Sequence, residues 1–235
     1  MDTFVEFGRY LADQGRGVLT VAGYSQDLAL FARWFEHTNG EPLTPVALTL
    51  TDAREYRQHL LRHKAKPATI NRHLAALKAY AAWAAETGQV EGNPISAVRG
   101  VAEQKHAPKW LDRKAQARLM RELEKTLANA RTASAKMKVA RNLALVRLLL
   151  NTGLRVGELC ALEIGDIPKL GERSGRLVVR EGKGCERREL PLNADARKAL
   201  SAWLEVRPKS ELSAVFVGRR GEPLTKSGIN RLLDG

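Results

Sequence analysis

The sequence holds few of the residues that mark secreted, metal-binding or membrane proteins. Only two cysteines occur among its 235 residues, and the spacing of Cys160 and Cys185 suits neither a disulfide framework nor a metal site. The amino-terminal segment lacks a basic-then-apolar signal pattern, and no uncharged apolar run is long enough to span a bilayer. These absences argue against a secreted or membrane protein, and we expect a cytoplasmic protein without a bound metal ion.

Aromatic residues are also scarce, at 6% of the chain, whereas Ala and Leu are abundant and Gly and Pro concentrate at junctions. This composition favours a mainly helical fold, and the length allows one large domain or two of ordinary size. We expect a helical domain over residues 1–96 and a second domain over residues 109–235. The segment between them, residues 97–108, has the composition of a linker, although an ordinary loop fits it equally well.

Hydrophobic periodicity predicts three helices in the first domain, over residues 20–35, from Thr51-Asp52 to residue 63, and after Pro67 with Thr69 as its cap. In the second domain it predicts helices over residues 111–127 and 141–150, then a short helix from Arg155 through residue 162. The pattern next alternates, which predicts strands over residues 176–180 and 187–192, joined as an antiparallel hairpin by a turn with glycines. A helix over 193–206, a short strand over 215–217 and a last helix capped by Thr225 complete the prediction.

The formal net charge of +13 favours a polyanionic partner, nucleic acid above all. Most of the excess lies in residues 101–235, which hold 28 Lys and Arg against 16 Asp and Glu. A second basic zone lies in the nearly neutral first part, where Glu55 is the only acid among seven basic residues: Arg54, Arg57, Arg62, Lys64, Lys66, Arg72 and Lys78. Two basic zones on separate segments predict a protein that touches DNA twice.

The segment Thr152–Leu159 reads Thr-Gly-Leu-Arg-Val-Gly-Glu-Leu, and Lys183 stands between two glycines in the turn of the predicted hairpin. These motifs resemble those of the tyrosine recombinase, or phage integrase, family, in its Xer-like or integron-integrase-like forms. Further segments extend the resemblance from Tyr24 to Gly235: residues 69–74, Asn93-Pro94, Pro191-Leu192 and residues 221–225. It implies a helical, SAM-like core-binding domain and a partial α+β catalytic domain with a small antiparallel sheet, which close as a C-shaped clamp around duplex DNA.

The chemistry implied by this resemblance uses no metal ion or cofactor. An arginine neutralises charge on the scissile phosphate, because its planar fork bonds two oxygens at once, and Arg155 matches that arginine. Glu158 either orients Arg155 or takes part directly, and Lys183 matches the hairpin lysine that delivers a proton. The DNA-binding residues that we expect are Lys66, Thr69, Asn71, Arg72, Lys78, Thr225, Lys226 and Arg231. For Arg72 and Lys78 a solvated helix face is the alternative, and the pattern supports generic phosphate contact without deciding whether either residue reads bases.

All four tyrosines and all five histidines precede Arg155. The resemblance implies a nucleophilic tyrosine and a His-x-x-Arg box after the hairpin, and neither occurs in this sequence. We therefore expect a chain that binds a double-stranded recombination site without cleaving it. One reading is an incomplete recombinase, whose full-length form assembles as a homotetramer on two sites. A naturally short, catalytically silent paralogue that regulates an active recombinase is another. A small helical transcription regulator is the third, and it gives Arg155 and Lys183 no role.

Overall fold

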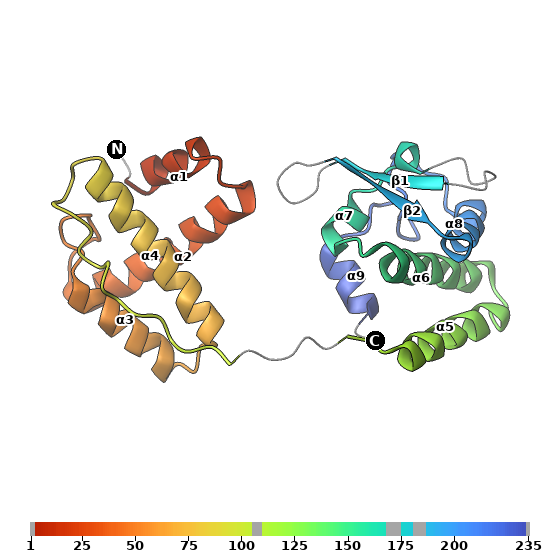
Figure 1. Ribbon diagram of the computed structural model, residues 1–235, viewed down its shortest axis with the longest axis horizontal. Coiled ribbons are helices and arrows are strands. Elements are labelled where there is room, and N and C mark those ends of the chain that lie inside the picture. The colour runs from red at the N-terminus through yellow and green to blue at the C-terminus, as the bar shows by residue number, and fades with distance from the viewer. Residues whose placement is uncertain (1–2, 105–109, 168–174, 181–186, 234–235) are drawn as a thin grey trace. The chain divides into compact units, whose positions relative to one another are not determined.

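The computed structural model describes residues 3–104, 110–167, 175–180 and 187–233. The chain divides into two compact units, residues 1–108 and residues 109–235 (Figure 1). Each unit has a hydrophobic core of its own. The described part is mainly helical with one two-stranded antiparallel sheet, which confirms the fold class expected from composition and periodicity. No helix in the described ranges is both long and apolar enough to cross a membrane.

Unit 1 is a bundle of helices around an aromatic core. Its helices are α1 (Thr3–Asp13), α2 (Val18–Asn39), α3 (Leu50–Arg62) and α4 (Pro67–Glu86). Helix α4 packs against the other three, because it buries an apolar stripe that includes Ile70, Leu77 and Tyr80. The rings of Phe7 and Tyr80 meet edge to face with centroids 5.5 Å apart, a geometry that aromatic pairs prefer.

The helix starts in unit 1 differ from those expected. Helix α3 begins earlier than Thr51, because Thr49 caps it: the Thr49 side chain accepts from the Asp52 amide, and the Asp52 carboxylate accepts from the Thr49 amide. The predicted cap at Thr69 is wrong: Lys66 occupies the N-cap position of α4 without a side-chain hydrogen bond, and Pro67 stands at the first helical position, where its missing N–H costs no hydrogen bond. Helix α1 has no counterpart among the expected elements.

Unit 2 is built around the central helix α6, which packs against α5, α7, α8 and β2 (Figure 1). Its elements are α5 (Arg113–Ala128), α6 (Ala133–Thr152), α7 (Val156–Cys160), the short 3-10 helix η1 (Ile164–Asp166), β1 (Gly175–Val179), β2 (Arg188–Leu192), α8 (Ala194–Val206) and α9 (Lys226–Leu233). Trp203 of α8 is fully buried, and its indole N–H donates to the Val215 carbonyl at 3.0 Å.

Strands β1 and β2 pair antiparallel as predicted, with Gly175 opposite Leu192 and Val179 opposite Arg188. The turn between them, with Lys183, lies outside the described residues. The predicted strand at 215–217 does not form as such. Within the described residues Val217 makes an isolated bridge with Pro223, and Ala214, just before the stretch, makes another with Glu163. The cap predicted for the last helix is present, since the Thr225 hydroxyl accepts from the Gly228 amide at 3.1 Å.

Candidate phosphate-binding site

Arg155 stands at a sharp junction between two helices. Helix α6 ends at Thr152, and Gly153 is its C-cap. The φ of Gly153, 65°, lies in the left-handed region that favours glycine, and its amide donates to the Leu149 carbonyl. Two residues later Arg155 is extended and forms the N-cap position of α7. Its side chain is 59% exposed. The local sequence therefore places an arginine at a helix start with its guanidinium toward solvent.

Glu158, one turn further, is buried beneath Arg155, with a side chain only 6% exposed. Its carboxylate accepts from the Arg155 amide at 2.9 Å and from Arg155 Nη1 at 2.7 Å. The contact to the amide is half of a capping box, in which an acidic side chain reaches back to the first residue of its own helix. Glu158 therefore fixes both the backbone and the side chain of Arg155.

A second arginine, Arg188 at the start of β2, meets the same carboxylate. Arg188 Nη1 lies 3.1 Å from Glu158 Oε1, and Arg188 Nη2 lies 2.6 Å from Oε2. The Arg188 hydrogen bond is the largest cause that lowers the pKa of Glu158 to about 2; both contacts from Arg155 add to it, and burial opposes it. The carboxylate is therefore ionised at neutral pH and joins α7 to the sheet.

Arg188 was not among the residues expected from the sequence. The predicted hairpin places Arg187 and Arg188 in one strand, and neighbouring strand residues face opposite sides of a sheet. A shift of one residue in strand register would exchange the faces of the sheet to which Arg187 and Arg188 point. The sequence pattern alone therefore does not tell which arginine faces α7. The observed pairing of Arg188 with Val179 gives the answer.

Lys226, at the start of α9, also reaches α7. A Cβ placed on Gly157 would stand 2.8 Å from Lys226 Cε and 3.1 Å from its Nζ, so the lysine lies over the glycine. Its charge lowers the pKa of Cys160, although burial of the thiol is the larger effect and raises it. The structure thus brings Arg155, Glu158 and Lys226 to one short helix. Arg231 is exposed on α9, where its Nε donates to the Ser227 carbonyl.

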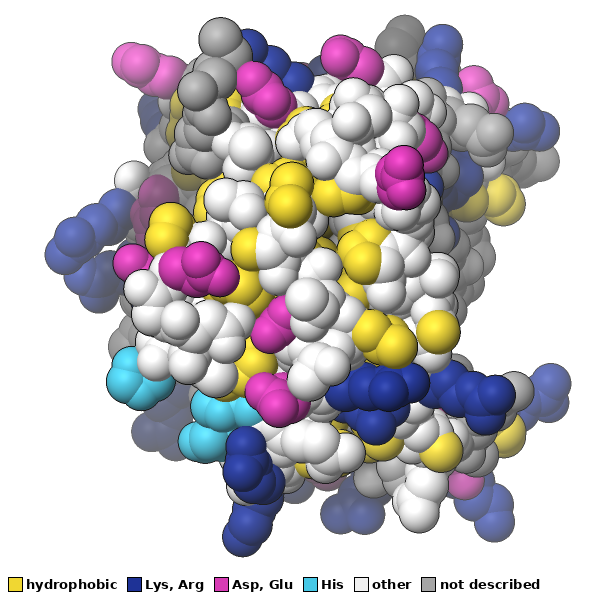
Figure 2. Space-filling view, turned by 90° about the vertical axis from the view of Figure 1, so that its left-hand side faces the viewer, with side chains coloured by type: hydrophobic (Ala, Val, Ile, Leu, Met, Phe, Trp, Pro, Cys, Tyr) yellow, Lys and Arg dark blue, Asp and Glu magenta, His cyan; other side chains and the backbone are white. Residues whose placement is uncertain are grey.

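The expected DNA-binding residues of unit 1 lie on or just before α4. Lys66 and Arg72 are exposed, and Thr69, Asn71 and Lys78 are partly buried. Figure 2 shows Lys, Arg and His side chains at the lower end of one face, where α3 ends and α4 begins in Figure 1. The exposed residues there agree with the basic zone expected from the sequence.

Two of the unit 1 residues have partners inside the protein. Arg72 Nη1 lies 2.8 Å from Oδ2 of Asp27, which is 1% exposed. The Asn71 carboxamide accepts from the Val101 amide at 2.8 Å and donates to the Val101 carbonyl at 2.9 Å. Asn71 therefore holds the chain segment that follows the bundle, and its contact with DNA stays a prediction.

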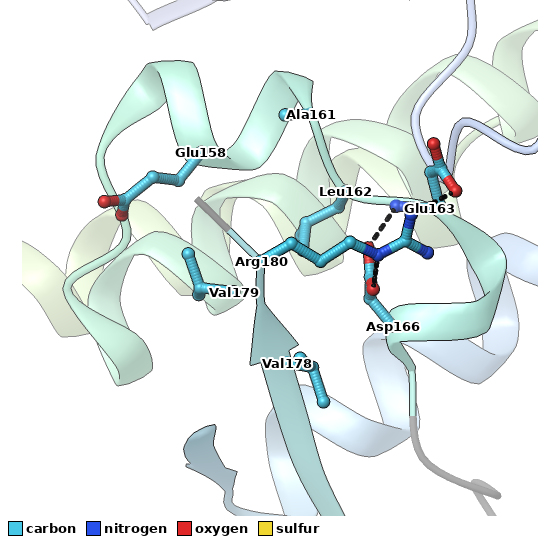
Figure 3. Close-up of a pocket in the computed structure, with 8 residues that line it drawn as sticks. All are labelled: Glu158, Ala161, Leu162, Glu163, Asp166, Val178, Val179 and Arg180. Atoms are coloured by element: carbon cyan, nitrogen blue, oxygen red, sulfur yellow. Dashed lines mark hydrogen bonds and ion pairs between the residues drawn. The ribbon is translucent and has the colours of Figure 1, made fainter. Parts of the chain in front are cut away.

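A second cluster of charges near α7 is separate from the first. The pocket in Figure 3 is lined by Glu158, Ala161, Leu162, Glu163, Asp166, Val178, Val179 and Arg180. Arg180 Nε lies 2.5 Å from Asp166 Oδ1, and its Nη1 lies 2.7 Å from Glu163 Oε2. The Glu158 carboxylate points away from Arg180 (Figure 3). The charge of Arg180 is thus balanced by two carboxylates of its own unit. Within the described residues, no set of three or more His, Cys, Asp or Glu is arranged to hold a metal ion.

Two family models match the chain. The phage integrase family model covers residues 109–235, and the model of the phage integrase N-terminal SAM-like domain covers residues 4–88. The tyrosine recombinase XerC of Mycobacterium tuberculosis is 33% identical over 226 residues, which are 93% of this chain and 72% of that protein. XerC of Corynebacterium efficiens is 28% identical over 222 residues, and there the chain spans 66% of the relative's length.

Solved structures share the fold. A lambda integrase dimer bound to a COC′ core site aligns over 99% of this chain and 78% of its own, with a TM-score of 0.70 and 16% identity. The XerH site-specific recombinase bound to a palindromic difH substrate, in a post-cleavage complex, aligns over 94% of this chain and 64% of its own, with a TM-score of 0.70 and 19% identity. Together with the two family models, which cover most of both units, these relatives assign the chain to the phage integrase family of tyrosine recombinases.

Proposed function

We propose that these 235 residues bind a double-stranded recombination site and hold one of its phosphates at Arg155, as part of site-specific recombination by a tyrosine recombinase. The observation that carries the proposal is the exposed Arg155 guanidinium, fixed at the start of α7 by the buried Glu158. An arginine held in this way offers its remaining N–H groups to an oxyanion, and such preorganised donors stabilise charge on a phosphate in its transition state.

The other expected residues take supporting roles in this proposal. Lys226 lies over the same helix as Arg155 and adds positive charge next to the phosphate. In a recombinase that also carries the nucleophilic tyrosine and the His-x-x-Arg box, Lys183 would deliver a proton to the leaving 5′-hydroxyl. On unit 1 the exposed residues Lys66 and Arg72 contact the DNA backbone, so that each unit binds the duplex through basic residues of its own. No metal ion or cofactor enters this chemistry.

Cleavage would need a nucleophile that these residues do not supply. No tyrosine and no histidine follows Arg155 in the sequence. We therefore propose that this polypeptide binds DNA without forming a covalent phosphotyrosine link. In the complete recombinase reaction, four copies of a chain with the tyrosine and the His-x-x-Arg box would act on two sites.

Titration of a fluorescent DNA duplex with the protein at several salt concentrations tests the proposal. Binding should weaken steeply with salt, because each neutralised phosphate releases counterions and contributes about −0.9 to the slope of log K against log salt. Replacing Arg155 with Ala should reduce that slope by about 1 and weaken binding, whereas Arg180→Ala should change it little, because Arg180 is already neutralised by Glu163 and Asp166.

A nicked duplex that traps covalent recombinase adducts gives the second half of the test. Incubation with this protein should leave no protein–DNA adduct on a denaturing gel. Binding that does not depend on salt, or an Arg155→Ala variant that binds like the unchanged protein, would contradict the proposed role of the site. A covalent adduct would contradict the proposal of binding without cleavage.

A further inference from the structure

The Glu158 carboxylate is shared unequally between its two arginines. It accepts four hydrogen bonds, which is about the full capacity of two carboxylate oxygens. Arg188 uses both of its terminal nitrogens in these bonds. Arg155 uses its backbone amide and Nη1 alone.

This division leaves the two guanidinium groups in different states. Within the described residues, Nε and Nη2 of Arg155 make no hydrogen bond, and the side chain is 59% exposed. Arg188 is 34% exposed, and both of its Nη atoms are committed to Glu158. Arg155 therefore has two guanidinium nitrogens, Nε and Nη2, that can donate to a phosphate. Arg188 donates from both of its Nη atoms to the Glu158 carboxylate.

Removal of Arg188 would leave two acceptor positions open on a buried, ionised carboxylate. Arginine and carboxylate favour a two-point, fork-to-fork arrangement, and a buried charge without partners is costly. Arg155 already touches Oε1, and a small turn of its guanidinium would bring a second nitrogen to Glu158. The group that should face the phosphate would then face the protein.

We infer that Arg188 is a positioning residue: by saturating Glu158, it keeps the fork of Arg155 available for a phosphate. The inference rests on the proposed function, in which Arg155 binds a DNA phosphate. Arg188 is suited to this part because β2 pairing with β1 fixes its backbone opposite Val179, while Glu158 belongs to α7. The hydrogen bonds from Arg188 therefore tie the carboxylate of α7 to a strand whose backbone is fixed by its pairing.

DNA binding by a set of variants tests the inference. Arg188→Ala should weaken binding as much as Arg155→Ala does, by roughly tenfold to a hundredfold, the range for loss of a charged hydrogen bond. The Arg155→Ala/Arg188→Ala double variant should lose no more than either single variant. Arg188→Lys should also bind weakly, because an ammonium keeps the charge but cannot occupy both carboxylate oxygens in the same plane. Arg180→Ala is the matched control for loss of a paired arginine beside the same helix.

A suppressor variant separates positioning from mere folding. In Glu158→Gln/Arg188→Ala the carboxylate that would capture Arg155 is gone, and the amide oxygen still accepts from the Arg155 backbone. This double variant should therefore bind DNA more tightly than Arg188→Ala. A structural role for Arg188 predicts the reverse, since both changes would remove packing and ion pairs. Additive losses in the Arg155/Arg188 pair, normal binding by Arg188→Lys, or no rescue by Glu158→Gln would each overturn the inference.

Inorganic phosphate gives a readout that does not depend on DNA binding. In protein with 15N-labelled arginine, the Arg155 Nε–H signal should shift on addition of phosphate. That shift should disappear in Arg188→Ala and return in Glu158→Gln/Arg188→Ala. If this pattern holds but duplex DNA does not bind, the proposed function fails and the positioning role stands. If DNA binds as proposed but Arg155 does not respond to phosphate in the unchanged protein, the positioning role fails alone.

Discussion

Lys226 occupies the space that any side chain on Gly157 would need. A Cβ at Gly157 would stand 2.8 Å from Lys226 Cε, closer than such carbons approach one another. The atoms that would have to move are the far end of a flexible side chain, so a small substitution displaces the lysine rather than the backbone. This contact explains why a glycine suits position 157 of the Thr152–Leu159 motif: without a side chain there, Lys226 of α9 can lie over α7.

Gly157→Ala should move Lys226 without unfolding unit 2. Alanine favours a helix over glycine by about 0.5–1 kcal/mol, so the melting temperature should stay level or rise slightly. Binding of duplex DNA should nevertheless weaken by a few-fold, because the ammonium is displaced from its place over α7. Thermal melting and fluorescence anisotropy measure the two effects. In a Lys226→Ala background the Gly157 change should have no further effect on binding, and an equal loss in both backgrounds would contradict this account.

Glu158 should make unit 2 sensitive to acid. Its pKa is about 2 in the folded protein, against a usual value of 4.5. The unfolded state then binds more protons between these values, so the stabilisation is fully present above about pH 5 and is lost as pH falls from about 4.5 to 2. The full effect is roughly 3 to 4 kcal/mol at most, since the pKa falls from 4.5 to about 2 and each pKa unit corresponds to 1.36 kcal/mol.

Urea unfolding of the unchanged protein and of Glu158→Gln, measured from pH 2 to pH 7, checks this dependence. The variant should be less stable at pH 7 and should lose less stability on acidification. The two curves should approach each other near pH 2. Parallel curves over the whole range would show that the charge on Glu158 contributes nothing to stability.

Asn71 should control how firmly the segment after the bundle is held. Its carboxamide makes one hydrogen bond to the Val101 amide and one to the Val101 carbonyl, and a Cβ on Gly100 would stand 2.6 Å from Asn71 Oδ1. Asn71→Ala should destabilise unit 1 by about 1–2 kcal/mol and speed hydrogen exchange at Val101. Asn71→Asp keeps the acceptor for the Val101 amide and should have a smaller effect on that exchange rate. Unchanged exchange in Asn71→Ala would contradict this role.

The parts of the molecule that were predicted from sequence are those set by local signals. The change of period from helical to alternating, with glycines between the strands, predicted the β1–β2 hairpin, and Gly153 predicted the end of α6 before Arg155. The predicted cap at Thr51-Asp52 was wrong by a small shift, because Thr49 and Asp52 together satisfy the helix start better.

Contacts between distant segments could not be predicted in this way. Arg188 is 30 residues from Glu158, and its place depends on strand register and on the packing of α7 against the sheet. Asn71 looked like a surface residue of a helix, and its partner Val101 lies 30 residues further on. A single sequence does not tell whether a polar side chain on a helix meets solvent, DNA or a remote stretch of backbone.

At the ion pair of Asp27 and Arg72, burial of the carboxylate and its pairing with the arginine have opposite effects on the pKa of Asp27. Burial raises the pKa of Asp27, while His73 and Arg72 lower it in part; burial also lowers the pKa of His73. Arg72→Ala removes the cation and leaves an almost fully buried carboxylate, so it should destabilise unit 1 more than Asp27→Asn does. In the Asp27→Asn/Arg72→Ala double variant the buried charge is gone, and stability should recover toward that of Asp27→Asn.

Chemical unfolding of the three variants at pH 7 measures the order of their stabilities. If Asp27→Asn alone proves as costly as Arg72→Ala, the pair contributes net stability, and the main function of Arg72 is to stabilise the bundle rather than to present a charge to DNA.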